Sequence, residues 1–295
     1  MLALRQRGDV RSLAVAEFLD TSGNDAPLSR ARLQAIGRSS NDPMITALAL
    51  LRPCAPDVCS NVEVSQWSRL EPANLNAWRA MLDSMTGRSA AHWAGYVLDR
   101  MGREGRYSRS YQKEFREAIL GLPQTDTPGL ASQAETQLLV GILAAWPIPR
   151  MSPLTLACGA DPSTAHRCAT VAELLWQQDD LMDHLGALGL VRRILTLRPD
   201  LRDHWEPRAR ELEALRAWQQ EAPPETDPVS EQGLSLCEAQ FRERKVLLAS
   251  IGRPEWGAAR AEMKARGADD AALSANWRRM GNRAVLDPLP AAPPR

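Results

Sequence analysis

Two stretches decide the fold of this chain, and the first reads Leu70-Glu71-Pro72-Ala73-Asn74-Leu75-Asn76-Ala77-Trp78. The second reads Leu197-Arg198-Pro199-Asp200-Leu201-Arg202-Asp203-His204-Trp205, with leucine, proline and tryptophan at the same spacing. Val64 and Val191 precede the two copies at equal distance. The chain therefore contains a repeated element, one copy in each half.

The proline of each copy predicts a turn between two helices. Proline removes a backbone donor and pushes the residue before it out of the α region, so the preceding helix ends there. Asn74 and Asp200 are favourable N-cap residues, and a new helix is expected after each. Trp78 and Trp205 then fall on the first turns, where a large ring can pack against the helix just ended. Each copy predicts a helical hairpin.

The order helix, Leu-x-Pro-x-Asn-x-x-Ala-Trp, helix resembles the join between successive tetratricopeptide repeats. Gly105-Arg106-Tyr107 resembles the glycine turn and aromatic residue inside such a repeat. The resemblance covers mainly residues 60–120, and no regular period of about 34 residues runs through the chain. It implies a tetratricopeptide-like array or an irregular α-solenoid that binds a peptide or protein.

Composition predicts an all-α protein. Of the 295 residues, 44% are hydrophobic and 24% charged, with nine tryptophans but only three phenylalanines and three tyrosines. Strand-like alternation of β-branched and aromatic residues is nearly absent. Glycines, prolines and threonines between 121 and 129 predict a boundary, and the prolines after 222 predict another. The expected segments are 1–120 (helical hairpins), 121–129 (linker), 130–222 (second helical region), 223–284 (C-terminal helices) and 285–295 (proline-rich tail).

Several helices are predicted by period and caps. Val10–Leu19 has helical periodicity, and Asp42 before Pro43 predicts a capped helix with proline in its first turn. A helix is expected from 107 to 120, and a long helical stretch from 163 to 197, loosened at its two glycines. Further helices are expected at 131–146 and 231–251.

Charge and hydropathy limit the kinds of partner and the cellular compartments that the sequence allows. Lys plus Arg equals Asp plus Glu at 36 each, which disfavours nucleic acid. No run of apolar residues is long enough for a transmembrane helix, and the first residues lack the apolar core of a signal peptide. The chain is therefore expected either in the cytoplasm or as a mature fragment behind an added methionine.

Four of the five cysteines fall in two local pairs. Cys54 and Cys59 flank one proline-bearing turn, and Cys158 and Cys168 flank another. Local disulfides would place the protein in an oxidising compartment such as a periplasm. Buried thiols and a zinc site are the alternatives, although neither spacing is that of a zinc knuckle. Cys237 is left over.

Chemistry-bearing residues cluster in Asp179-Asp180-Leu181-Met182-Asp183-His184. On a helix Asp180 and His184 would share a face, as a base with its orienting acid or as two metal ligands. The same pattern occurs on any solvated helix. No HExxH, P-loop or GxSxG motif is present, so the sequence predicts no cofactor.

A recognition surface is the other candidate site. Trp67, Trp78 and Trp93 fall within one expected hairpin region, and Arg103 and Arg106 belong to a local basic stripe. Tryptophan is enriched both in binding hot spots and between packed helices, so a core role is the alternative.

Two functions follow from these patterns. The first is a non-enzymatic scaffold or adaptor for a protein or peptide, in the bacterial envelope if the cysteines are oxidised, or as an accessory factor of a secretion system. The second is an all-helical acid/base or metal-dependent enzyme that uses the cluster ending at His184.

Overall fold

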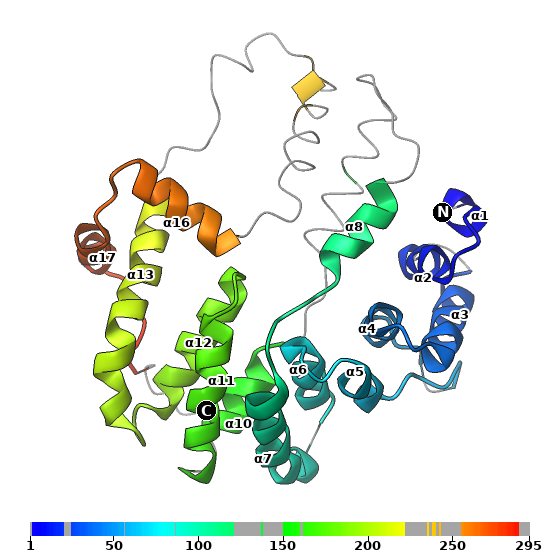
Figure 1. The fold of residues 1–295 in the computed structure, drawn as a ribbon, viewed down its shortest axis with the longest axis horizontal. Coiled ribbons are helices and arrows are strands. Elements are labelled where there is room, and N and C mark those ends of the chain that lie inside the picture. Colours follow the sequence, from blue (N-terminus) through cyan, green and yellow to red (C-terminus); the bar gives the residue numbers. More distant parts are fainter. Residues whose placement is uncertain are drawn as a thin grey trace. The chain divides into compact units, whose positions relative to one another are not determined.

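A computed structural model describes residues 2–20, 25–55, 57–85, 87–120, 150–159, 162–221 and 255–288, with the single positions 137, 235, 238, 239 and 242. Every regular element in these residues is a helix, which confirms the all-α prediction (Figure 1). None of the described helices is long and apolar enough to cross a membrane. The expected linker at 121–129, the helices at 131–146 and 231–251, the boundary after 222 and the end of the tail lie outside the described residues.

The chain forms two compact units. Unit 1 contains Met1–Met81 and continues from Arg109, whereas unit 2 contains Leu82–Ser108, continues from Arg150 to Glu225 and resumes at Arg253. The units therefore differ from the chain-order segments, because residues 82–108 belong with later parts of the chain. Each unit contains one cysteine pair.

Unit 1 buries an apolar core between short helices. Leu33, Leu48, Trp67 and Phe115 are almost fully buried, and Phe18 meets Phe115 edge to face with ring centroids 5.3 Å apart. Its helices are α1 (Leu2–Gln6), α2 (Val10–Leu19), α3 (Ala26–Ser39), α4 (Pro43–Leu51), α5 (Val64–Leu70), α6 (Leu75–Ser84) and α8 (Gln112–Leu120).

The predicted cap of α4 is confirmed. Asp42 accepts a hydrogen bond from the backbone N–H of Met44 at 3.0 Å, with Pro43 as the first helical residue. Helix α2 has the predicted bounds and is capped in the same way, since Asp9 accepts from the N–H of Ser12 at 2.8 Å.

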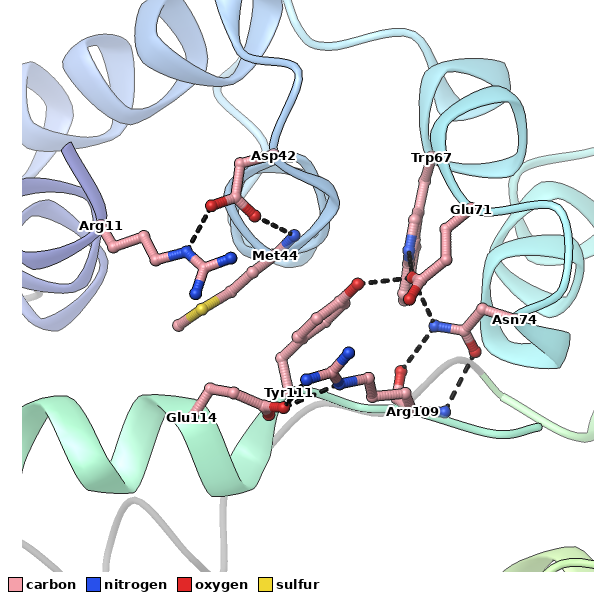
Figure 2. A network of polar contacts seen from close by, with 9 residues as sticks. All are labelled: Arg11, Asp42, Met44, Trp67, Glu71, Asn74, Arg109, Tyr111 and Glu114. Carbon is pink, nitrogen blue, oxygen red and sulfur yellow. Dashed lines mark hydrogen bonds and ion pairs between the residues drawn. The ribbon is translucent and has the colours of Figure 1, made fainter.

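The first join is held by a buried carboxylate (Figure 2). Glu71 accepts hydrogen bonds from Trp67 Nε1 at 3.1 Å, Asn74 Nδ2 at 2.8 Å and the Tyr111 hydroxyl at 2.5 Å. Asn74 Oδ1 accepts from the N–H of Asn76 at 3.0 Å, which confirms Asn74 as the cap of α6. The turn therefore ties α5, α6 and the segment before α8 together.

Two expected helices have different limits in the structure. The helix predicted from 107 begins only at Gln112. The backbone N–H groups before it bond to side chains: the N–H of Ser108 donates to Gln178 Oε1, and the N–H of Arg109 donates to Asn74 Oδ1. The stretch 163–197 is interrupted at 177–180 rather than at its glycines. Asp180 caps the next helix there by accepting from the N–H of Met182 at 2.7 Å.

Unit 2 is built around α13 and the pair α11 and α12. Its elements are α7 (Gly87–Glu104), α10 (Ser152–Gly159), the 3-10 turn η1 (Pro162–Thr164), α11 (Ala165–Trp176), α12 (Leu181–Ile194), the 3-10 turn η2 (Pro199–Leu201), α13 (Arg202–Glu221), α16 (Glu255–Ala265) and α17 (Asp270–Arg279). A second buried carboxylate, Glu213 of α13, accepts from Ser274 Oγ at 2.7 Å, Arg278 Nε at 2.9 Å and the N–H of Val285 at 2.9 Å. It fixes α17 and the segment after it on α13.

The second join lacks the predicted Asp200 cap. Turn η2 leads directly into α13, and Asp200 instead forms a bidentate ion pair with Arg198 at 2.9 and 2.6 Å. Trp205 is buried as predicted, but its ring meets Trp176 of α11, with centroids 6.0 Å apart. The two copies thus share the helix-turn-helix path and differ in the contacts that hold it.

Candidate functional site

The three candidate tryptophans have different environments. Trp67 and Trp78 are 1% and 3% exposed, and Trp78 Nε1 donates to the carbonyl of Pro72 at 2.8 Å. The prediction that they line a recognition surface is therefore wrong for these two, because their rings fill the core around the first join. Trp93 on α7 is 47% exposed.

One side of α7 carries exposed aromatic and basic side chains. Trp93, Tyr96, Arg100 and Arg103 follow one another at spacings of three or four residues, which places them along one side of a helix. Tyr96 is 44% exposed, and its ring meets Trp93 edge to face with centroids 5.7 Å apart. These four residues are called the α7 stripe below.

The arginines of the α7 stripe are ordered by neighbouring groups. The Arg100 guanidinium lies 5.9 Å from the Tyr96 ring centroid and pairs with Glu104 at 2.8 Å. Arg103 pairs with Asp99, which also lies 3.9 Å from Arg167 of α11. Short-range pairing of this kind restrains long side chains at the surface and lowers the entropy they would lose on binding.

Arg106 lies just beyond the α7 stripe. Its Nη1 donates to the carbonyl of Gly105 at 2.6 Å, and its side chain is exposed. The sequence patterns named Trp93, Arg103 and Arg106 as candidates and did not include Tyr96 or Arg100. Counting three and seven residues onward from Trp93 on a helix would have found both.

Both cysteine pairs lie at disulfide distance. The sulfur atoms of Cys54 and Cys59 are 2.22 Å apart, and those of Cys158 and Cys168 are 2.15 Å apart. Cys158 and Cys168 are fully buried and link the end of α10 to α11. The zinc alternative finds no support in the described residues, where no cluster of three or more His, Cys, Asp or Glu side chains could hold a metal ion.

Two of the acids before His184 accept hydrogen bonds from backbone N–H groups. Asp180 caps α12, and Asp179 accepts from the N–H of Gly257 at 2.8 Å through Oδ1. Asp183 is buried on α12. His184 itself is 2% exposed, and its Nε2 lies 2.7 Å from the carbonyl oxygen of Gln178. These side chains hold α12 and α16 in place rather than opening onto a cleft.

Unit 1 has a shallow groove. It has a volume of about 700 Å³ and lies among α2, the end of α3 and the start of α4. Val10 and Ile36 contribute apolar surface to the groove. Asp42, which also lines it, forms an ion pair with Arg11 and caps α4.

No protein family model, curated protein or solved structure matches this chain.

Proposed function

We propose that this chain is a non-enzymatic helical scaffold that binds a protein or peptide partner through the α7 stripe. The observation that carries this proposal is the exposure of Trp93 and Tyr96, side by side, on a helix that otherwise packs against α10 and α11. Tryptophan, tyrosine and arginine are the residues most enriched in binding hot spots. The stripe combines all three within three helical turns.

The fold supports a scaffold of the tetratricopeptide-like or irregular α-solenoid kind. Both joins are helix-turn-helix elements with a buried tryptophan after the proline. The two cysteine pairs support an oxidising compartment, such as the bacterial envelope, because local disulfides persist there and not in reducing cytosol. An accessory role beside a secretion system is a narrower form of the same proposal.

The enzyme hypothesis has less support from the geometry. A general base needs access to a substrate proton, whereas His184 is buried and its ring lies between two indoles. Asp179 and Asp180 already accept backbone hydrogen bonds at helix starts.

The test is site-specific photocrosslinking followed by affinity measurement. A benzophenone amino acid replaces Tyr96 in one variant and Leu28, which is 56% exposed on α3 of unit 1, in the control. A partner captured only from the Tyr96 position is purified, and its Kd is measured against wild type, Trp93→Ala and Leu28→Ala. We expect Trp93→Ala to weaken binding by about tenfold or more, as hot-spot truncations do, and Leu28→Ala to leave it unchanged. Equal capture from both positions, or an unchanged Kd in Trp93→Ala, contradicts the proposal.

A further inference from the structure

His184 lies in an aromatic enclosure inside unit 2. Its ring stacks on Trp256 of α16 with centroids 4.0 Å apart and planes inclined by 19°. On its other side it meets Trp176 of α11 edge to face, with centroids 4.3 Å apart. The imidazole is thus packed between α11 and α16 at the first turn of α12.

The start of α16 is attached at the same place. The N–H of Trp256 donates to the carbonyl of Asp179 at 3.1 Å, and the N–H of Gly257 donates to its carboxylate at 2.8 Å. Segment 179–184 therefore supplies acceptors for N–H groups in the first turn of α16, which have no partner within the helix, and also supplies the His184 ring on which Trp256 stacks.

The hydrogen bond at Nε2 fixes the tautomer of the neutral ring. A carbonyl oxygen only accepts, so Nε2 carries a proton that it donates to Gln178, and Nδ1 of the neutral ring carries a lone pair. Nδ1 is buried, with no hydrogen-bond partner among the described residues. A protonated ring would place a second N–H there, without an acceptor and out of contact with water.

Opposing effects act on the charge of His184. Burial lowers its pKa below the ordinary value, and this effect is larger than the opposite effects of the Gln178 carbonyl and of the Asp179 and Asp180 carboxylates. The face of the stacked Trp256 indole also attracts a cation, but the enclosure keeps water away from it. Other charged groups lie nearby: Asp183 precedes His184 on α12, and Glu173 of α11 pairs with Arg208 of α13, whose guanidinium lies 5.9 Å from the Trp176 ring centroid.

We propose that His184 is a proton-operated latch for α16: the neutral imidazole holds the helix through Trp256, and the imidazolium releases it. The charged ring reaches water by leaving the stack, which uncovers Trp256 and withdraws the packing surface of the first turn of α16. Helix α17 stays in place, because Glu213 of α13 accepts hydrogen bonds from Ser274 and Arg278 of α17, and His184 takes no part in them.

The direction of the pH dependence follows from linkage. The pKa of His184 is lower in the latched state than in the released state, where the ring is solvated, so the released state binds more protons between the two values. The latch is fully closed above about pH 6.5, the ordinary imidazole pKa, and weakens as pH falls toward the pKa of the latched state. Each pH unit between the two pKa values changes the ratio of latched to released molecules by about tenfold.

The test follows Trp256 by fluorine NMR of protein labelled with fluorotryptophan, the signal being assigned with Trp256→Phe. We expect a transition of the Trp256 signal with a midpoint below about pH 6.5. Below that pH, amide exchange corrected for intrinsic rates should become faster in α16 than in α17, by up to about tenfold for each pH unit. His184→Phe keeps an aromatic ring that cannot be protonated, and should abolish the transition. His184→Gln serves the same purpose if the phenylalanine variant does not fold.

His204→Gln is the matched control, because His204 lies in the same unit and is exposed beside Glu173. This variant should keep the transition of the wild type. A Trp256 signal that stays constant down to about pH 4.5, or a transition that persists without a histidine at 184, overturns the latch.

Discussion

The side chain of Asn74 pairs with the backbone of Arg109 as a neighbouring strand would. Nδ2 donates to the carbonyl of Arg109 at 2.9 Å, and Oδ1 accepts from its N–H at 3.0 Å (Figure 2). The same carboxamide caps α6 and donates to Glu71. One residue of the first join thereby fixes a segment 35 residues away, and the backbone leaves this clamp just before Tyr111, whose φ is 61°.

Asn74→Ala should strongly destabilise unit 1. The change leaves the Asn76 N–H without a partner in a buried site and the Arg109 backbone groups without partners in a partly buried one, and unsatisfied buried groups cost about 1–3 kcal/mol each before relaxation. We expect a loss of about 2–4 kcal/mol in the free energy of unfolding, measured by urea denaturation. Asn41→Ala, at an exposed position, should stay within about 0.5 kcal/mol of wild type. Equal midpoints for the two variants would contradict the clamp.

Two glycine substitutions should have opposite signs. A Cβ on Gly37 would lie 2.7 Å from Ala49 Cβ and 2.8 Å from Val62 Cγ2, so Gly37→Ala overpacks the contact between α3 and α4 and should cost about 1–3 kcal/mol. A Cβ on Gly189 meets nothing within 4 Å in the middle of α12. Gly189→Ala should therefore stabilise the protein by about 0.5–1 kcal/mol through helix propensity. Thermal unfolding of the two variants measures both, and a destabilised Gly189→Ala would show the open space to be occupied.

The tryptophans should separate into core and surface by their effect on stability. Trp67 is 1% exposed and donates to Glu71, so Trp67→Ala removes both packing and a hydrogen bond and should cost about 3–5 kcal/mol. Trp93→Ala should cost less than about 1 kcal/mol, because its ring is half exposed. Denaturant midpoints compare the two, and a large loss in Trp93→Ala would assign that ring to the core and weaken the proposed function.

Reduction should lower the stability of both units. The loops closed by the cysteine pairs span 5 and 10 residues, for which loop-closure entropy corresponds to about 2–3 kcal/mol per disulfide. Intact mass after alkylation under denaturing conditions should show Cys54, Cys59, Cys158 and Cys168 protected until a reductant is added. Five modified thiols in protein purified under oxidising conditions would overturn the pairing and, with it, the support for an oxidising compartment.

Two glutamates of α13 should respond to neutralisation in opposite ways. Burial raises the pKa of Glu211, an effect that outweighs the attraction of Arg260. A raised pKa means that the folded state binds the extra proton, so stability falls as pH rises from the ordinary carboxyl pKa through the folded value. Glu211→Gln should therefore stabilise the protein at neutral pH and lose this advantage in acid.

Glu206 is the matched control on the same helix. Burial alone would raise its pKa, but hydrogen bonds from Arg278 and Arg210 outweigh burial and lower it. Its contribution to stability is present above the ordinary carboxyl pKa and is lost as pH falls through the folded value. Glu206→Gln should thus destabilise the protein at neutral pH. Urea unfolding at several pH values measures the stability of both variants. If Glu211→Gln and Glu206→Gln change the free energy of unfolding in the same direction at neutral pH, the opposite roles of the two carboxylates are refuted.

The sequence predicts helix ends and caps correctly where a single residue determines them. Helix α5 ends just before Pro72, Asp42 and Asn74 cap α4 and α6, and the apolar period of Val10–Leu19 matches the bounds of α2. The cysteine spacings predicted both pairs, because loops of 5 and 10 residues bring their ends together with little loss of entropy.

The tertiary structure decided whatever depends on partners distant in sequence. Asn74 and Gln178 hold the backbone before α8 in a non-helical path, which no local propensity at 107–111 indicates. Trp67 and Trp78 are buried and Trp93 is exposed, although the three side chains are identical and equally favour apolar surroundings. His184 contacts Trp256 only because α16 packs beside it. A sequence shows which side chains need partners, whereas the tertiary packing determines which residues become those partners.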